Sequence, residues 1–251
     1  MNAILGFGFV ALGLAASVFG AAGGTYALLT DRPYLLKTVR QWALLVLVAA
    51  VGAFTVMEIA LFQRDWEIAF VSRVGSETTP TLFNFASLWS SLEGSILLWA
   101  LVLAGYLAAM VWKFRNRGED RLLGWAIVVM LVVCAFFFAL MVGPANPFVT
   151  TEVPPGFTGP GPNPLLQNHI LMAFHPPMLY LGYVGFTVPF AFAIAALITR
   201  RTGDIWFRTT RRWTIFSWFA LGTGIMLGSY WAYIELGWGG YWAWDPVENA
   251  S

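Results

Sequence analysis

Two histidines are the side chains in this sequence best suited to bind a metal. His175 precedes Pro176 and Pro177. A residue before proline is biased away from helical geometry, whereas proline is well tolerated in the first turn of a helix. The pattern therefore predicts that His175 lies at the start of a helix, where a neutral imidazole could bind a metal, cap the helix or face water. His169 has no motif around it and is interpreted as a surface histidine.

The stretch "WGGYWAWD" is the second candidate for ligand binding. Its aromatic rings offer a flat, rigid surface, and its two glycines let the chain pass close to a bound molecule. The alternative is an interfacial aromatic belt, but a belt is scattered over helix ends rather than gathered in one loop. A planar hydrophobic ligand that carries a metal for the histidine would use all of these features, and haem is the simplest such ligand. The candidate haem-binding residues are His175, as axial ligand of the iron, with Trp238, Gly239, Gly240, Tyr241, Trp242, Trp244 and Asp245.

Membrane helices must position these groups. The 251 residues are 59% hydrophobic and only 11% charged, with a mean hydropathy of +0.70, which excludes an ordinary soluble domain. Apolar runs of roughly 20 residues predict about six transmembrane helices in a single polytopic domain, and hence an all-α integral membrane protein. The first run lacks the basic flank of a signal peptide and is interpreted as a retained helix. The predicted helices span about 4–29, 42–62, 87–112, 122–143, 177–199 and 213–235.

The basic residues predict the orientation of these helices. Twelve of the 14 lysines and arginines lie in alternate connections, those between the first and second, third and fourth, and fifth and sixth helices. Short basic loops stay on the cytoplasmic side of a membrane. We therefore expect the N-terminus, the loop before His175 and the tryptophan-rich loop at 236–251 on the outer face. Since the charges serve topology, they give no reason to expect a nucleic-acid partner.

The remaining reactive groups are few. Cys134, the single cysteine, falls inside a predicted helix and has no partner for a disulfide or a metal site, so it is interpreted as a packing residue. Glu58, Glu93 and Glu235 lie near outer helix ends, where snorkelling to water explains a carboxylate more simply than catalysis. Asp245 could brace the tryptophan-rich loop or contact the ligand directly.

At these residues the sequence resembles the bacterial cytochrome c-type biogenesis haem lyase subunits of the CcmF/NrfE/CcsA family. The WWD domain of that family is matched by "WGGYWAWDPVENAS" at 238–251. Further matches follow in family order: "WSSLEGSILLW", "NPF", "NPLLQ", "HPPMLYLGYVGF" and "LGSYWAYIELGWGG". Tyr241 departs from the family, which commonly has tryptophan there. A second departure is "GPGPNPLL", where many members carry a charged residue before the asparagine.

The resemblance implies covalent attachment of haem, bound in its b-type form, to the Cys-x-x-Cys-His motif of an apocytochrome c. It implies a bacterial inner-membrane location with the active face on the periplasmic side. A haem chaperone and thiol-reducing or apocytochrome-binding subunits would be the other partners. Family members are longer, with a second outer histidine and a histidine pair for a membrane haem beyond the region matched here, so we expect this chain to be the N-terminal portion of such a protein.

Two alternatives to a lyase remain. The WWD segment is also found in haem-handling proteins, so the chain could export haem and present it to a separate lyase. A quinol-linked electron-transfer protein would instead need histidines within the helices, and neither histidine is predicted there.

Overall fold

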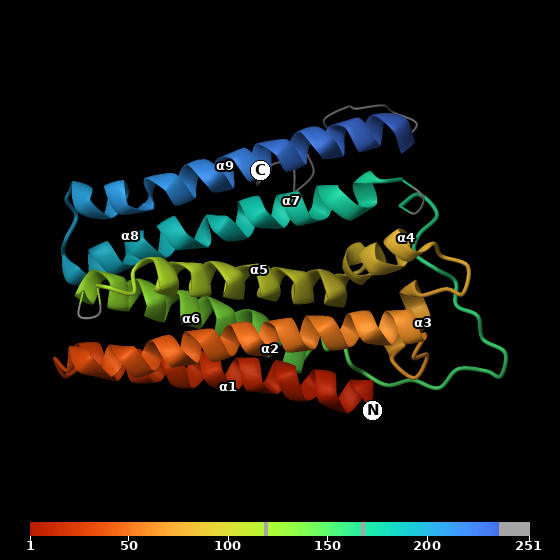
Figure 1. Cartoon of the computed structure of the whole chain (residues 1–251), viewed down its shortest axis with the longest axis horizontal. Helices are drawn as coiled ribbons and strands as arrows, with labels where there is room; N and C mark the ends of the chain where they lie inside the picture. The colour runs from red at the N-terminus through yellow and green to blue at the C-terminus, as the bar shows by residue number, and fades with distance from the viewer. Residues whose placement is uncertain (118–119, 167–168, 236–251) are drawn as a thin grey trace.

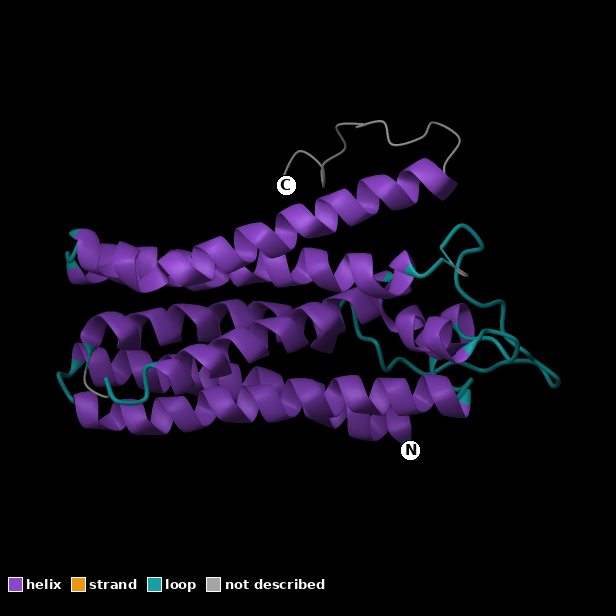
Figure 2. Ribbon diagram, turned by 45° about the horizontal axis from the view of Figure 1, so that its top comes forward, coloured by secondary structure: helices purple, strands orange, loops and turns teal. Residues whose placement is uncertain are grey.

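Long helices run side by side along one axis of the computed structural model, which describes residues 1–117, 120–166 and 169–235 (Figure 1). Figure 2 shows helices joined by loops, and among the described residues β pairing is limited to one bridge between Ile68 and Thr150. The predicted all-α fold is confirmed. The long helices are α1 (Asn2–Leu29), α2 (Leu36–Gln63), α5 (Leu92–Lys113), α6 (Arg121–Val142), α7 (Leu171–Gly185), α8 (Thr187–Thr199) and α9 (Asp204–Glu235). The short helices are η1 (Pro33–Leu35), α3 (Ala69–Val74), α4 (Thr81–Ala86) and η2 (Ser87–Ser90).

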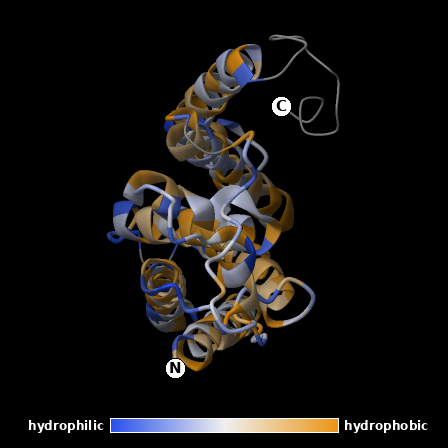
Figure 3. Ribbon diagram, turned by 90° about the vertical axis from the view of Figure 1, so that its right-hand side faces the viewer, coloured by the Kyte–Doolittle hydropathy of each residue, from blue (hydrophilic) through white to orange (hydrophobic). Residues whose placement is uncertain are grey.

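The two ends of the bundle differ in composition. The α1–α2, α5–α6 and α8–α9 connections, which carry most of the lysines and arginines, lie together at one end, here called the basic end (Figure 1). The N-terminus, α3, α4, the start of α7 and the end of α9 lie at the opposite end, here called the histidine end. Seen from the histidine end, the helices are largely the orange and white of hydrophobic and neutral residues (Figure 3). The grouping of the basic connections predicted from the sequence is therefore present in the fold.

Five stretches of helix in the described part of the chain are long and apolar enough to cross a membrane: α1, α2, α5, α6, and α7 with α8 as one span. The chain is thus an all-α, multi-pass membrane protein. The sixth predicted span corresponds to α9, which begins at Asp204 rather than 213 and is not among the five. Its glycines, tyrosines and tryptophans lower the mean hydropathy, although no charged residue lies between Arg212 and Glu235. At 1.5 Å per residue those uncharged residues would cover roughly 33 Å, so a sixth span stays a prediction.

The predicted helix at 87–112 begins later than expected. Residues 87–90 form the 3-10 helix η2, Ser91 is extended, and α5 starts at Leu92. A Cβ atom on Gly94 would lie 1.7 Å from the Leu88 carbonyl oxygen, so only glycine allows the chain to fold back this closely. The hydroxyl of Ser95 donates a hydrogen bond to the Trp89 carbonyl and closes the turn.

The predicted helix at 177–199 is two helices that meet at Phe186. Pro189 lies in the first turn of α8, where proline is tolerated because the first helical N–H groups have no partner inside the helix. The same ring cannot donate to the carbonyl of Gly185, so the α7 hydrogen-bond ladder ends there. The Tyr106 hydroxyl donates to the nearby Leu181 carbonyl at 2.6 Å and ties α5 to α7 close to the break.

Glycines at intervals of one heptad let α1 pack closely on α6. A Cβ atom on Gly13 would lie 2.2 Å from the Phe138 ring, and one on Gly20 would lie 3.1 Å from Leu131. Phe138 is fully buried. Without side chains of their own, these glycines form notches that accept the large apolar residues of α6, an arrangement that suits helices in a membrane.

Arginines at the basic end complete helix termini. The Arg40 guanidinium donates to the carbonyls of Phe114, Arg115 and Arg117 beyond the end of α5. Arg121 donates to the Leu28 carbonyl at the end of α1 and pairs with Asp31. These side chains satisfy carbonyls that have no partner within a helix, in addition to the topological role predicted for the basic residues.

The loop between α6 and α7 is held against the segment around α3. Thr151 N–H donates to the Glu67 carbonyl, and Gly161 N–H donates to the Gly75 carbonyl. The Trp66 and Phe157 rings pack edge to face at 5.4 Å. The Pro- and Gly-rich stretch at 154–164 is irregular, and its backbone is fixed to the bundle at the histidine end.

Candidate functional site

His175 lies inside α7 rather than at its start. The helix begins at Leu171 and includes Pro176 and Pro177, so the sequence-based placement of its first residue is wrong by several positions. Pro176 has no N–H to donate to the Met172 carbonyl, but the Trp89 indole N–H donates to that oxygen at 2.8 Å. An indole from η2 replaces the missing backbone donor, and the helix continues through the prolines.

The imidazole of His175 is held by α9. Its Nδ1 lies 2.8 Å from the Gly224 carbonyl oxygen, and its ring lies over Gly228, where a Cβ atom would be 2.5 Å from Cε1. Farther along the same two helices, a Cβ atom on Gly182 would lie 2.5 Å from the backbone of Leu221. Three glycines therefore bring α7 and α9 close enough for a backbone carbonyl of one helix to bind a side chain of the other.

This hydrogen bond fixes the tautomer of the neutral ring. A carbonyl oxygen can only accept, so Nδ1 carries the hydrogen of a neutral His175 imidazole. The lone pair then resides on Nε2, the nitrogen that binds metals in this tautomer. Metal-binding histidines commonly donate their other N–H to a backbone carbonyl, which orients the ring. Of the three roles left open by the sequence, the arrangement suits metal ligation best.

His169 lies close to the same site. Trp231, on α9, stacks on the His169 ring at 6.1 Å between centroids and meets the His175 ring edge to face at 5.9 Å. The Nδ1 atom of His169 accepts a hydrogen bond from Leu171 N–H at the start of α7. The interpretation of His169 as an isolated surface residue missed this proximity. Trp231 belongs to the family-like stretch "LGSYWAYIELGWGG", which marks it as a candidate site residue. Nothing in the sequence, however, indicates that it contacts either histidine.

The other predicted haem-binding residues follow α9. They lie outside the described residues, which end at Glu235, so their placement as a haem platform stays a prediction. The described part of α9 ends at the histidine end of the bundle, where α7 begins (Figure 1). These residues are Trp238, Gly239, Gly240, Tyr241, Trp242, Trp244 and Asp245.

The three carboxylates near the histidine end differ in environment. Glu58 is 8% exposed, and neither of its oxygens has a hydrogen-bond partner among the described residues, so snorkelling to water is wrong for this residue. The reason is that its face of α2 is covered within the bundle. Glu93 accepts from Arg73 at 2.6 Å, which supports the structural role expected for it. Glu235, the last residue of α9, is partly exposed.

Other metal-binding arrangements receive no support in the described part of the chain. Among those residues no three His, Cys, Asp or Glu side chains come together as ligands. Cys134 is 1% exposed within α6, as expected for a packing residue. The candidate site is therefore the oriented imidazole of His175, with Trp231 of α9 and the imidazole of His169 beside it.

The fold and this site define a multi-pass helical membrane protein that holds a histidine ring in a fixed orientation at one end of the bundle. The chain belongs to the cytochrome C assembly protein family, whose profile matches residues 89–251. That match covers the helices that build the site and the tryptophan-rich segment that follows them. The resemblance to haem lyase subunits of the CcmF/NrfE type is confirmed.

Individual relatives agree with this assignment. The chain is 42% identical over 219 residues to the cytochrome c-type biogenesis protein CcmF of Pseudomonas aeruginosa, covering 84% of this chain and 33% of the relative. It is 36% identical over 248 residues to NrfE of Haemophilus influenzae, covering 98% of this chain and 38% of the relative. A solved structure of the cytochrome c haem lyase CcmF matches all of this chain and 39% of its own, with a TM-score of 0.85 and 37% identity. The chain thus spans about a third of the length of these proteins.

Proposed function

We propose that this chain takes part in cytochrome c maturation by binding haem at the histidine end and holding it for covalent attachment to an apocytochrome c. The observation that carries the proposal is the hydrogen bond between His175 Nδ1 and the Gly224 carbonyl, which leaves Nε2 as a ligand for iron. The relatives' names, cytochrome c-type biogenesis protein and cytochrome c haem lyase, support the reaction class.

The donor set suits haem better than a bare metal ion. The porphyrin supplies four nitrogen ligands, so the protein needs to offer only one or two axial ligands, and one oriented imidazole is sufficient on this side. Trp231 places an indole beside both histidines and offers an apolar surface next to the His175 ring. We propose that Trp238, Trp242 and Trp244 extend this surface beyond α9 and that Asp245 completes the loop.

Haem is the substrate in this proposal, and the sulfur comes from the partner. The S–H group of each cysteine in a Cys-x-x-Cys-His motif adds across a vinyl C=C bond of haem: sulfur bonds to one carbon and hydrogen to the other, so no external oxidant is required. The buried Cys134 does not compete as a thiol. The contribution of this chain is to hold haem in one plane and one orientation.

Delivery and orientation complete the proposal. A haem chaperone would supply haem, and thiol-reducing or apocytochrome-binding subunits would supply the reduced motif. We place the histidine end on the periplasmic side of a bacterial inner membrane, because the opposite end carries twelve of the 14 basic residues. In this orientation α9 crosses the membrane as the sixth span and returns the chain to the periplasmic side.

The haem content of variants tests directly whether His175 is the iron ligand. In full-length protein, His175→Ala should lower haem per protein by about tenfold, the effect of losing an oriented ligand with its supporting contacts. His169→Ala is the matched control, since it removes an imidazole from the same tryptophan and should retain most haem. Equal haem content in His175→Ala and unmodified protein would overturn the ligand assignment.

A cellular experiment separates attachment from delivery. Cells that lack this protein are supplied with haem on the outer face, and covalent cytochrome c is measured by haem staining of denatured protein. If the protein takes part in the lyase reaction, covalent attachment of haem to cytochrome c fails in these cells even when haem is supplied. Continued attachment would show that the protein exports or presents haem to a separate lyase.

A further inference from the structure

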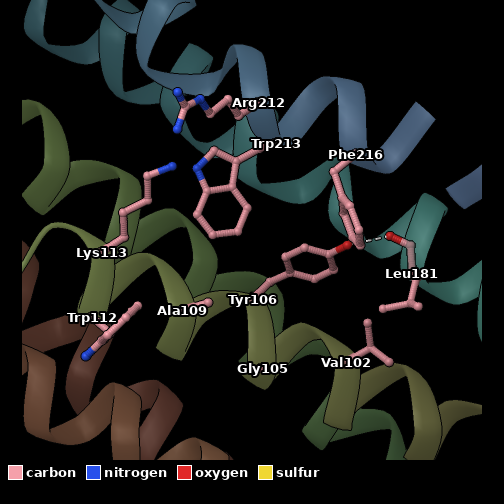
Figure 4. A pocket seen from close by; sticks show the side chains of 10 residues that line it. All are labelled: Val102, Gly105, Tyr106, Ala109, Trp112, Lys113, Leu181, Arg212, Trp213 and Phe216. Atoms are coloured by element: carbon pink, nitrogen blue, oxygen red, sulfur yellow. Dashed lines mark hydrogen bonds between the residues drawn. The ribbon is translucent and has the colours of Figure 1, made fainter. Parts of the chain in front are cut away.

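A cavity of about 660 Å³ lies between α5 and α9 toward the basic end, away from the histidine site. Figure 4 shows its side chains converging from these two helices, with Leu181 of α7 at the far side. The cavity is open at one side, and two of its lining residues, Trp112 and Phe216, are 69% and 49% exposed. In a membrane protein, a hollow of this kind on the outer surface of the helices faces lipid.

The floor of the cavity is formed by two small residues of α5, Gly105 and Ala109. Lys113 follows at the same interval of four, so all three residues share one helix face. A Cβ atom on Gly105 would have no atom within 4 Å, so its missing side chain is open space. From Val102 to Lys113 the lined stretch of α5 measures roughly 16 Å, about the hydrocarbon thickness of one leaflet.

In contrast to the apolar floor, one side of the cavity carries positively charged and N–H groups. Figure 4 shows the Lys113 ammonium, the Arg212 guanidinium and the Trp213 indole nitrogen on the same side of the cavity. The Lys113 Nζ lies 5.1 Å from the centre of the Trp213 ring. Trp213 Nε1 is buried and has no hydrogen-bond partner in the described structure. No carboxylate among the described residues forms an ion pair with Lys113 or Arg212.

We propose that this cavity binds one anionic phospholipid, with its phosphate at Lys113 and Arg212 and an acyl chain along the Gly105–Ala109 floor. Basic pockets between membrane helices on the cytoplasmic side commonly hold anionic headgroups. A phosphate accepts from the ammonium and the guanidinium, and the Trp213 ring lines the cavity beside them. Free phosphate would leave the apolar floor exposed, and a neutral lipid would leave two adjacent cations unbalanced.

The site is independent of haem binding, because its residues lie toward the other end of α5 and α9. The lipid would fill the space between α5 and α9, since α9 packs mainly on α7 and α8 rather than on α5. A helix from the further length found in the relatives is the competing occupant, and the experiments below distinguish it from lipid.

Native mass spectrometry of the full-length protein tests the headgroup contacts. Purified protein is titrated with phosphatidylglycerol, phosphatidylcholine or inorganic phosphate, and one tightly bound phosphatidylglycerol is expected. Lys113→Gln with Arg212→Gln should weaken that binding by about 30-fold, since two cations near an anionic headgroup are lost. Lys37→Gln with Arg211→Gln removes the same charges from exposed positions at the basic end and should leave the tight site intact.

Filling the floor tests the acyl chain. Gly105→Leu retains both cations and places a side chain in open space, so the fold should persist while the tight lipid is lost. Gly222→Leu is the matched control, since its side chain also meets no atom within 4 Å but lies on α9 outside the cavity lining. The proposal is overturned if unmodified protein binds phosphatidylglycerol and phosphatidylcholine equally, if inorganic phosphate displaces the lipid, or if Gly105→Leu retains it. A helix in the cavity would exclude the lipid from unmodified protein and would make Gly105→Leu destabilising.

Discussion

Two glycine-lined seams, α1 against α6 and α7 against α9, use the same small residue for different purposes. In the first seam the notch at Gly13 accepts the fully buried Phe138 ring. In the second, Gly182 brings two backbones together and Gly228 accepts the imidazole of His175. The first seam therefore serves packing. The second places a polar ring against a backbone carbonyl, which leaves one nitrogen of that ring available for a ligand.

Gly182→Leu should have the largest effect on stability. Its Cβ would lie 2.5 Å from backbone atoms of Leu221, and a backbone cannot move aside as a flexible side chain can. We expect α7 and α9 to separate, so that most folded protein and nearly all bound haem are lost. Size-exclusion profiles recorded for protein and for haem measure both losses. Gly222→Leu on the open face of α9 is the control. A Gly182→Leu protein with a normal profile would contradict the close approach of the two backbones.

Gly13→Ala should lower stability but not the haem bound per folded molecule. Alanine gains about 1 kcal/mol of helix propensity over glycine, but overpacking against a buried ring costs roughly 1–3 kcal/mol. Because Phe138 is fully buried, we expect a net loss of up to about 2 kcal/mol, measured as a lower midpoint of thermal unfolding in detergent. A selective loss of haem would contradict the assignment of this seam to packing.

Trp89→Phe should cost about 1 kcal/mol, because the Met172 carbonyl loses the indole donor that compensates for Pro176. The double variant Trp89→Phe with Pro176→Ala restores a backbone N–H and should recover part of the loss. The unfolding midpoints of Trp89→Phe, Pro176→Ala and the double variant measure the energetic coupling between the indole and the proline. If the two changes are simply additive, the indole does not replace the proline's missing donor.

Gly228→Ala should have the smallest effect on stability and a selective effect on haem. The gain in helix propensity offsets much of the cost of displacing His175, which lies at the edge of the seam and is partly exposed. The displaced ring loses its contact with the Gly224 carbonyl, so haem per folded molecule should fall several-fold. Equal haem losses in Gly13→Ala and Gly228→Ala would remove the distinction between the seams.

The sequence predicts the features of this molecule that depend on local patterns. Hydropathy locates the first four long helices, with the starts of α2 and α5 misplaced by five or six residues, and the arginines at 200–212 mark the basic end. The His-Pro-Pro pattern correctly indicates a helix at this place but puts its first residue several positions too late. These features depend on the length and charge of continuous segments, which the sequence contains directly.

Contacts between distant segments account for what the sequence does not predict. The early start of α7 depends on the Trp89 indole, which comes from another helix. The proximity of His169 to Trp231 depends on how α7 and α9 cross. Neighbouring helices cover the face of α2 that carries Glu58, so its carboxylate is buried. The expectation that it reaches water, which was based on its position near a helix end, fails for that reason. The tryptophan-rich residues at 238–245 remain a prediction from the sequence.

The most direct test of the central claim is the haem spectrum of full-length His175→Gly protein, recorded with and without added imidazole. Removing the side chain leaves a gap beside the Gly224 carbonyl that free imidazole fits. The account predicts that haem binding is lost in the variant and returns when imidazole is added, whereas His169→Gly shows neither change. Full haem binding by His175→Gly without imidazole would contradict the assignment of His175 as the iron ligand.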